Sequence, residues 1–431
     1  MTNPISVLIL IGGFFFLLAF KVPIAFALAL SAFAAAWHHG IPLTAVALSM
    51  INGINSFGLI AIPFFIIAGN LMGDGGVADR LISLADVLIG RVRGGLAMVN
   101  ILSSKFFGTV SGSAVADTSA LGTVLIPMME KQGYDREFSV ANTTSSSILG
   151  ILIPPSHNML IYAMAAGGGI SIAAMFMAGI VPAVIAGIGL MLVSYVIARK
   201  NNYPKSRKYT FKEGIKIIVQ SLVGLMTIII IVGGIVSGVF TATEASVAGV
   251  LYAFFVTFVV YREIPFKQFW TIMKKSLRTV AIVMAIISAS SAFGFMMALL
   301  QIPAMFANAV LSISDNPIVI LLLVNLLIML LGLFMDMAPM ILIGTPIFLP
   351  IATAMGVNPV QFGIMLLLNL GIGLLTPPVG TVLFVGCSVG RVKVEDVIKP
   401  LLPYYLVLII TLILITFIPA LTLWLPGVLI R

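Results

Sequence analysis

Two polar interruptions within apolar sequence hold most of the residues that could do chemistry in this chain. The first spans 108–114 and reads GTVSGSA, and the second spans 332–338 and reads GLFMDMA. Each is followed downstream by a double proline, Pro154-Pro155 and Pro377-Pro378 respectively. In a membrane, irregular backbone is tolerated only where it is buried in protein or lines a cavity. Interrupted apolar segments at matching positions of two halves indicate a transporter binding site.

The first interruption offers the oxygen atoms that a hard cation prefers. The serines on either side of Gly112 supply hydroxyl groups, and the helix break there frees backbone carbonyls, which coordinate sodium, while exposed N–H groups favour a carboxylate. The double proline removes backbone donors, and the glycine before it lets the backbone approach closely. The candidate residues of this first sodium and substrate site are Ser111, Gly112, Ser113, Gly150, Pro154, Pro155 and Ser156.

The second interruption repeats this arrangement and adds a carboxylate, Asp336. A carboxylate at mid-membrane is costly unless it is paired or hydrated, which favours a role in ion or substrate coupling. The alternative is that Asp336 caps a helix that begins near Met337. The candidates of this second site are Met335, Asp336, Gly373, Thr376, Pro377, Pro378 and Thr381. We expect one sodium ion per half, with an organic anion between the two tips.

Three further polar residues are weaker candidates. Asp117 lies one turn beyond the first interruption, where packing or capping would explain it equally well. Asn142 lies in the apolar segment that leads to Pro154. Glu244 follows Thr241-Ala242-Thr243 and could simply cap the helix that starts at 242.

Composition places all these residues in a helical membrane protein. Hydrophobic residues make up 61% of the 431 residues and charged residues only 9%, with a mean hydropathy of +1.20. The alternation of a lipid-facing barrel is absent, so the spanning elements are helices. The net charge of +9 then reports loop orientation and not nucleic-acid binding. A single cysteine excludes an internal disulfide. No Walker lysine, zinc-ligand spacing or serine-elbow motif occurs, so we expect no enzyme and no cofactor beyond the coupling ion.

The apolar segments predict an all-α polytopic fold of about ten transmembrane helices plus two re-entrant hairpins, at 97–130 and 317–355. Each half of a hairpin is too short to cross the hydrocarbon core. The runs 5–20 and 22–37 fit either one tilted helix or two spans. Residues 43–56 are expected to lie at the membrane interface, 301–316 to form a loop, and 401–424 to form the last span.

The two halves are in register. Pro127 plus 223 is Pro350, Pro154 plus 223 is Pro377, and Gly150 plus 223 is Gly373. The basic clusters at 199–216 and 262–278 share one side if both hairpins return to the side they left, while 301–316, opposite, contains no Lys or Arg. This layout predicts inverted-topology repeats with both termini outside, which permits alternating access.

Several separated motifs resemble the large membrane subunit of tripartite ATP-independent periplasmic (TRAP) transporters. These motifs are SGSAVAD at 111–117, IPPS at 153–156, FMD at 334–336 and LTPPVG at 375–380. The resemblance implies an elevator motion of a transport domain against a scaffold in the bacterial inner membrane. It also implies a small four-helix membrane subunit and a soluble periplasmic binding protein as partners, and an organic anion of the C4-dicarboxylate or sialic acid type as substrate.

The resemblance also implies a division of the chain. The predicted units are scaffold helices and an interfacial segment at 1–56, a first transport repeat at 57–199, scaffold helices and a cytoplasmic arm at 200–278, a second transport repeat at 279–399, and a scaffold helix at 400–431. Other readings remain open: a stand-alone carrier of the divalent-anion/sodium symporter type, an ion channel, and a non-transporting receptor or assembly protein. The substrate, the sodium stoichiometry and the oligomeric state are not identified by the sequence.

Overall fold

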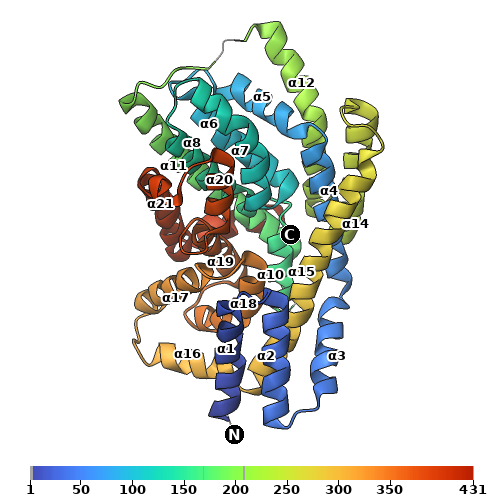
Figure 1. The fold of residues 1–431 in the computed structure, drawn as a ribbon, viewed down its shortest axis with the longest axis vertical. Coiled ribbons are helices and arrows are strands. Elements are labelled where there is room, and N and C mark those ends of the chain that lie inside the picture. The colour runs from blue at the N-terminus through green and yellow to red at the C-terminus, as the bar shows by residue number, and fades with distance from the viewer. Residues whose placement is uncertain (1–2, 168, 207–208, 431) are drawn as a thin grey trace.

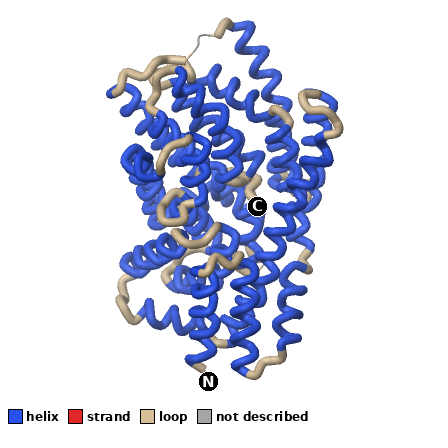
Figure 2. Tube along the Cα trace, viewed as in Figure 1, coloured by secondary structure: helices blue, strands red, loops and turns tan. Residues whose placement is uncertain are grey.

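The computed structural model describes residues 3–167, 169–206 and 209–430, which are overwhelmingly helical with no β-strand among them (Figure 2). The elements of the first half are α1 (Pro4–Ala19), α2 (Ile24–His39), α3 (Leu43–Ile54), η1 (Phe57–Ile60), α4 (Ala61–Asp74), α5 (Val77–Ile89), α6 (Gly95–Ser111), α7 (Ala114–Lys131), α8 (Arg136–Ser147), α9 (Leu149–Leu152), α10 (His157–Ala165) and α11 (Ile172–Lys200).

The second half continues in the same style (Figure 1). Its elements are α12 (Phe211–Ile228), η2 (Ile229–Gly233), α13 (Gly234–Val236), α14 (Ala242–Phe255), η3 (Val256–Tyr261), α15 (Gln268–Leu299), α16 (Ile302–Leu311), α17 (Pro317–Gly332), α18 (Met337–Ala354), α19 (Pro359–Leu374), α20 (Thr381–Gly390), α21 (Val394–Phe417) and α22 (Ala420–Leu429).

Six helices of the described chain are long and apolar enough to cross a membrane, or up to eight if each of two bent pairs counts as one span. One bent pair is the segment Arg136–Leu152 with His157–Ala165, which turns by 51° at the first double proline. Several other apolar helices have only 10–16 residues, short of the roughly 20 that a complete span needs. The fold is therefore a helical, multi-span bundle, and the count of about ten spans stays a prediction.

Two boundaries predicted from the sequence are wrong. Residues 301–316, expected to be a loop, contain the helix α16, which begins at Ile302 with Pro303 in its first turn, a position where the missing N–H costs nothing. The last span, expected at 401–424 without interruption, divides into α21 and α22 at Ile418 and Pro419. Proline cannot continue a helix because it lacks the donor and clashes with the preceding turn.

The helices that follow the two interruptions begin at matching positions. Helix α7 starts at Ala114 and α18 at Met337, and 114 plus 223 is 337. Helix α8 starts at Arg136 and α19 at Pro359, and 136 plus 223 is 359. Both double prolines contain a cis peptide bond. Segments 97–130 and 317–355 are thus each a pair of helices in contact, α6 with α7 and α17 with α18, and neither is one continuous rod.

Two buried helices position the interruptions. Every residue of α19 from Gln361 to Leu374 is buried, and the helix contacts α17, α18 and α21 (Figure 1). Helix α8 is buried from Phe138 to Ser147, although it contains a run of Thr and Ser. Those hydroxyls donate to carbonyls one turn back in the same helix, as Ser145 Oγ does to Ala141 O at 2.7 Å. Pairing within the helix lets these hydroxyls be buried, and Thr143 and Ser146 also hydrogen-bond to Asn100 and Ser104 of α6.

The loop between α11 and α12 holds both ends of the first hairpin. Pro204 O accepts from Gly94 N at 3.1 Å, just before α6 begins. Tyr203 Oη donates to Asp135 Oδ2 at 2.5 Å, in the turn that follows α7. Tyr134 Oη in that turn donates to Pro204 O at 3.3 Å. We call residues 203–206 the clasp, because this segment hydrogen-bonds to the residues just before α6 and just after α7 and so joins the two ends of the hairpin.

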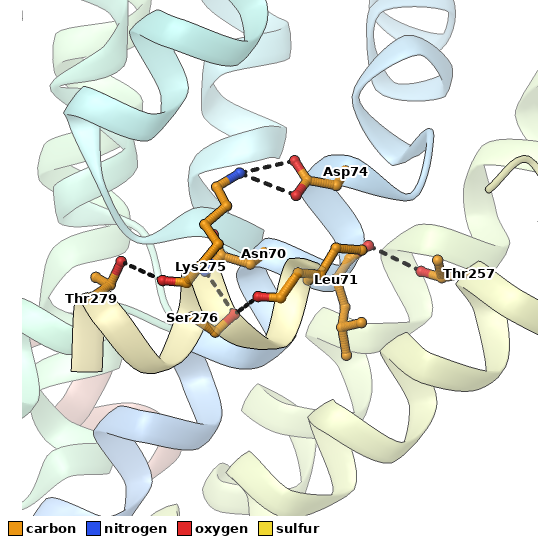
Figure 3. Close-up of polar contacts among 8 residues, drawn as sticks. Asn70, Leu71, Asp74, Thr257, Lys275, Ser276 and Thr279 are labelled. Carbon is orange, nitrogen blue, oxygen red and sulfur yellow. Dashed lines mark hydrogen bonds and ion pairs between the residues drawn. The ribbon is translucent and has the colours of Figure 1, made fainter. Parts of the chain in front are cut away.

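Helix α4 is attached to α15 and η3 by polar contacts (Figure 3). Asn70 Nδ2 donates to Ser276 Oγ at 2.9 Å, and Lys275 Nζ lies 3.0 Å from Asp74 Oδ1. Thr257 Oγ1 donates to Leu71 O at 3.1 Å. The end of α4 is therefore fixed to two elements that follow it by almost two hundred residues.

Candidate functional site

The first tip is a tight turn whose hydroxyls are used locally. Helix α6 ends at Ser111, Gly112 adopts the left-handed conformation with φ of +59°, and Ser113 caps α7 by accepting from Ala116 N at 3.3 Å. Ser111 Oγ accepts from Ser113 N at 3.3 Å. The left-handed backbone is the reason for glycine at the centre of the turn.

This tip contacts the segment that follows the first double proline. A Cβ on Gly112 would lie 3.3 Å from Pro155 O and 3.2 Å from His157 Nδ1. Asn158 Nδ2 donates to Gly112 O at 3.5 Å. Below the tip, Gly108 and Gly150 are in backbone contact, so that a Cβ on Gly108 would overlap the Cα of Gly150. The sequence-predicted residues of the first half are therefore brought together.

A buried carboxylate lies one turn beyond this tip. Asp117 is fully buried; its Oδ1 accepts from Ser104 Oγ at 3.4 Å, and its Oδ2 has no partner among the described residues. Ser104 and Ser146 share a hydrogen bond of 3.0 Å, and the hydroxyl of Ser156 is likewise buried and unpartnered. A Cβ on Gly150 would lie 3.6 Å from Asp117 Oδ2. The unpaired oxygens could contribute to a cation site, because such oxygens in a dry environment gain from a positive charge.

The second tip repeats the close backbone approach. A Cβ on Gly373 would lie 2.9 Å from the carbonyl carbon and oxygen of Gly332. Asp336 is exposed and caps α18, its Oδ1 accepting from Met337 N at 2.9 Å, whereas Met335 is buried. The structure thus confirms that Asp336 caps α18. The Oδ2 atom of Asp336 stays available to a ligand.

The residues after α19 complete this second arrangement. Thr376 Oγ1 donates to Ile372 O at 2.8 Å, and the hydroxyl of Thr381 is buried without a partner in the described chain. Pro377 is half-buried and Pro378 exposed. Tyr405 Oη, from α21, donates to Leu375 O and holds the backbone just before the double proline.

The chain also matches a known family over most of its length. The family model described as "Tripartite ATP-independent periplasmic transporter, DctM component" matches residues 11–421. The chain belongs to this family of TRAP large permease subunits. It is therefore a multi-pass membrane protein, and the resemblance carried by the sequence motifs is confirmed.

Individual relatives agree with this assignment. The chain is 42% identical over 423 residues to the uncharacterized protein YgiK of Salmonella typhimurium, covering 97% of each chain. It is 40% identical over 377 residues to the sialic acid TRAP transporter large permease SiaM of Vibrio cholerae, covering 88% of each. The YdaH transporter of Alcanivorax borkumensis superposes with a TM-score of 0.62 at 15% identity, over 87% of this chain and 88% of that one, a likeness of fold.

The two remaining candidates in the permease lie away from the tips or have a structural role. Asn142 Nδ2 donates to Ser194 Oγ at 2.9 Å and to Tyr404 Oη at 3.3 Å, a buried contact between α8, α11 and α21. Glu244 forms a capping box with Thr241, accepting from Thr241 N at 2.8 Å. The Nδ2 group of Asn142 and the carboxylate of Glu244 are thus used in contacts within the protein, whereas Asn142 Oδ1 is buried without a partner among the described residues.

Sequence reasoning missed three contributors to the sites. Asn158 and Ser104 are polar residues within apolar segments, a signal that could have identified them, as it did Asn142. Tyr405 gives no such signal, because tyrosine in a last span is equally typical of the membrane interface. Among the described residues no three His, Cys, Asp or Glu side chains gather as a metal centre would need. The sodium roles of the candidate residues stay predictions.

Proposed function

We propose that this TRAP large permease imports an organic anion of the sialic acid or C4-dicarboxylate type, coupled to sodium, by an elevator mechanism. It works in the inner membrane with both termini periplasmic, together with a small four-helix subunit and a periplasmic binding protein, and it has no enzymatic activity. The observation that carries the proposal is the paired glycine contact, Gly108 with Gly150 and Gly332 with Gly373, which seats each broken segment against a double proline.

Each pairing gathers groups suited to a sodium ion. Backbone carbonyls are left unpaired where the helices end at the tips, and Ser156 and Thr381 bring buried hydroxyls that have no partner among the described residues. Helices α7 and α18 begin at the two tips. The free N–H groups and the dipoles at these helix N-termini favour the carboxylate of a substrate that lies between the tips. Sodium bound beside the anion would offset its charge, which is a physical basis for coupling.

We further propose inverted repeats and the mobile unit that goes with them. In this proposal the hairpins 97–130 and 317–355 are re-entrant, and the segments within 57–199 and 279–399 that carry them form the transport domain. The recurrence of helix starts at an offset of 223, from Ala114 to Met337 and from Arg136 to Pro359, supports the repeat.

Asp336 gives the decisive test of coupling. Asparagine caps helices as well as aspartate does, so Asp336→Asn should keep the melting temperature of the purified complex within about 2–3 °C. Uptake in proteoliposomes should fall at least tenfold, or require a several-fold higher sodium concentration for half-maximal rate. Asp315→Asn, in the exposed turn before α17, is the matched control and should leave uptake unchanged. Normal sodium dependence of uptake in Asp336→Asn would show that Asp336 only caps α18 and has no role in coupling.

Reconstitution separates the proposal from its alternative, a stand-alone divalent-anion symporter. The large permease alone should give no uptake, and addition of the small subunit and the loaded binding protein should restore sodium-dependent uptake. Uptake by the permease alone would favour the stand-alone carrier. Flux that is indifferent to substrate and shows no counterflow would instead identify a channel.

A further inference from the structure

A cavity of about 340 Å³ lies away from both tips, between α3, α10, α15 and α18. By contrast, the space beside the first tip, lined by Thr109, Ser111 and His157, measures only about 10 Å³, enough for roughly one water molecule. The larger cavity has room for on the order of ten waters at about 30 Å³ each. In this conformation the first tip cannot enclose an organic anion, whereas the larger cavity can.

Three polar side chains of the cavity have no hydrogen-bond partner in the described chain. Ser290 is only 3% exposed and its hydroxyl is unpaired. Asn52 and Ser56, across from it on α3 and the turn that follows, also lack side-chain partners among the described residues. A buried hydroxyl without a partner is unfavourable, so an occupant that hydrogen-bonds Ser290 would recover part of that cost.

One wall of the cavity is held rigidly. Ser288 Oγ donates to Met50 O and Ser49 Oγ donates to Ser291 O, each at 3.1 Å, which fixes α3 to α15. The opposite wall comes from Met164 on α10 and Leu342 on α18. Those two helices are the ones that begin directly after the first double proline and the second tip. An occupant would therefore touch both the fixed helices and the broken ones.

The chemistry of the lining selects the occupant. The described residues that line the cavity include no Lys, Arg, His, Asp or Glu, so none of them would neutralise a deeply buried carboxylate. A lipid tail would leave the buried Ser290 hydroxyl unpaired. Asn52 is exposed, so the cavity opens at that residue and a charged group of the ligand need not be buried in the cavity.

We propose that this cavity binds the neutral, hydroxyl-bearing part of a sugar-acid substrate as a second site on the transport path. The proposal rests on the proposed function and narrows its substrate class to polyhydroxylated monocarboxylates. Hydroxyl groups of the ligand pair with Ser290, Ser56 and Asn52, and its carboxylate lies toward the opening.

Thiol protection tests the site without the binding protein. Ser290→Cys is introduced in a Cys387→Ala background, which removes the single native thiol. The large and small subunits in liposomes are treated with a small methanethiosulfonate reagent. N-acetylneuraminate or gluconate at millimolar concentration should slow labelling at least threefold, and succinate should not. Ser312→Cys, at the exposed end of α16, is the control and should be protected by none of the acids.

Two outcomes would overturn the inference: labelling at the same rate with every acid, or protection that depends only on the lipid composition of the liposomes. Uptake assays keep this result separate from the proposed function. Sodium-dependent uptake together with unprotected Ser290→Cys removes the second site and leaves the transporter assignment standing. Ser290→Ala provides a second measurement, since it should raise the half-saturating N-acetylneuraminate concentration several-fold with little change in maximal rate.

Discussion

Two pairs of glycines set how closely each hairpin approaches its double proline. Gly108 meets Gly150 and Gly332 meets Gly373 with no side chain between the backbones. At such a distance carbonyls and hydroxyls from two chain segments can reach one small cation, which a layer of side chains would prevent. The glycines thus contribute to the site through the space they leave free.

Adding one methyl group should separate the segments. Gly108→Ala places a Cβ in the Cα of Gly150 and should lower sodium-dependent uptake at least tenfold, with about 1–3 kcal/mol lost from stability. Gly427→Ala, in α22, has no atom within 4 Å of the new Cβ and serves as the control. Uptake in a sodium titration and thermal unfolding are the measurements. Equal behaviour of the two variants would contradict the role given to the contact.

A conservative change at Glu244 separates capping from transport. Glutamine completes a capping box as glutamate does, so Glu244→Gln should retain uptake within about twofold. Thr241→Ala removes the other half of the box and should cost about 0.5–2 kcal/mol in unfolding measurements. Loss of uptake in Glu244→Gln with normal stability would show that the charge itself is needed.

Local chemistry could be predicted from the sequence at the residue scale, and long-range partners could not. Gly112 and the double prolines restrict their own backbone, so the breaks follow from residue type alone. The Tyr405 contact with Leu375 and the Ser104 contact with Asp117 depend on how helices pack, which no spacing along the chain reveals. Asn142 could be identified from the sequence as a polar residue in an apolar segment. Its position in a contact between three helices could not be predicted.

At the scale of elements, the clasp joins the two ends of the first hairpin. Burial raises the pKa of the Tyr134 phenol to about 12. Burial and the hydrogen bond to Asp135 also raise the pKa of Tyr203. Both phenols are therefore favoured in their neutral form, in which they donate to Asp135 and Pro204. A raised pKa gives stability that is present below the ordinary value near 10 and is lost as pH rises through the folded-state value.

Removing one hydroxyl should expose this dependence. Tyr203→Phe should lower stability by about 1–3 kcal/mol at neutral pH, because it deletes a hydrogen bond to a carboxylate. The difference from the unaltered protein should shrink above pH 10, as the phenol ionises. Tyr195→Phe, in α11, is the control, because the Tyr195 side chain makes no hydrogen bond among the described residues. A stability difference that stays constant up to pH 12 would contradict the assignment.

The two wrong predictions of element boundaries have the same cause. Helix α16 and the break before α22 both lie in apolar sequence containing proline, where composition fits a loop, a helix start or a helix end. Pro303 starts a helix and Pro419 separates two, and only the surrounding packing decides between these outcomes. By contrast α7, α8 and α18 were predictable, because glycine or proline marks the chain just before or within them.

At the scale of the whole molecule, the contacts of α4 bear on where a moving unit would begin. Helix α4 is bonded to α15 and η3 through Asn70, Asp74 and Leu71, and Arg80 of α5 forms an ion pair of 2.7 Å with Glu263. These contacts support keeping α4, α5 and α15 together with the scaffold, so that the first transport segment starts nearer Gly95 than residue 57 and the second starts after α15 and not at residue 279.

Cross-linking tests this boundary. A short thiol cross-link between Asn70→Cys and Ser276→Cys, in a Cys387→Ala background, should leave uptake unchanged because the two helices move together. The matched pair Ser290→Cys and Leu342→Cys joins α15 to α18 across the cavity, and its cross-link should stop uptake. Arrest by the first pair would return α4 to the moving unit.

Helix α8 carries a consequence of a different kind. Its threonine and serine hydroxyls are occupied by its own carbonyls, so it presents methyl and methylene groups to α20. The glycines of α20 receive that surface directly, since a Cβ on Gly386 would overlap Thr144 and one on Gly390 would overlap Val140. Because side chains of α8 lie directly against the backbone of α20 at these two positions, displacement of either helix should carry the other, so that α8 and α20 behave as one rigid body.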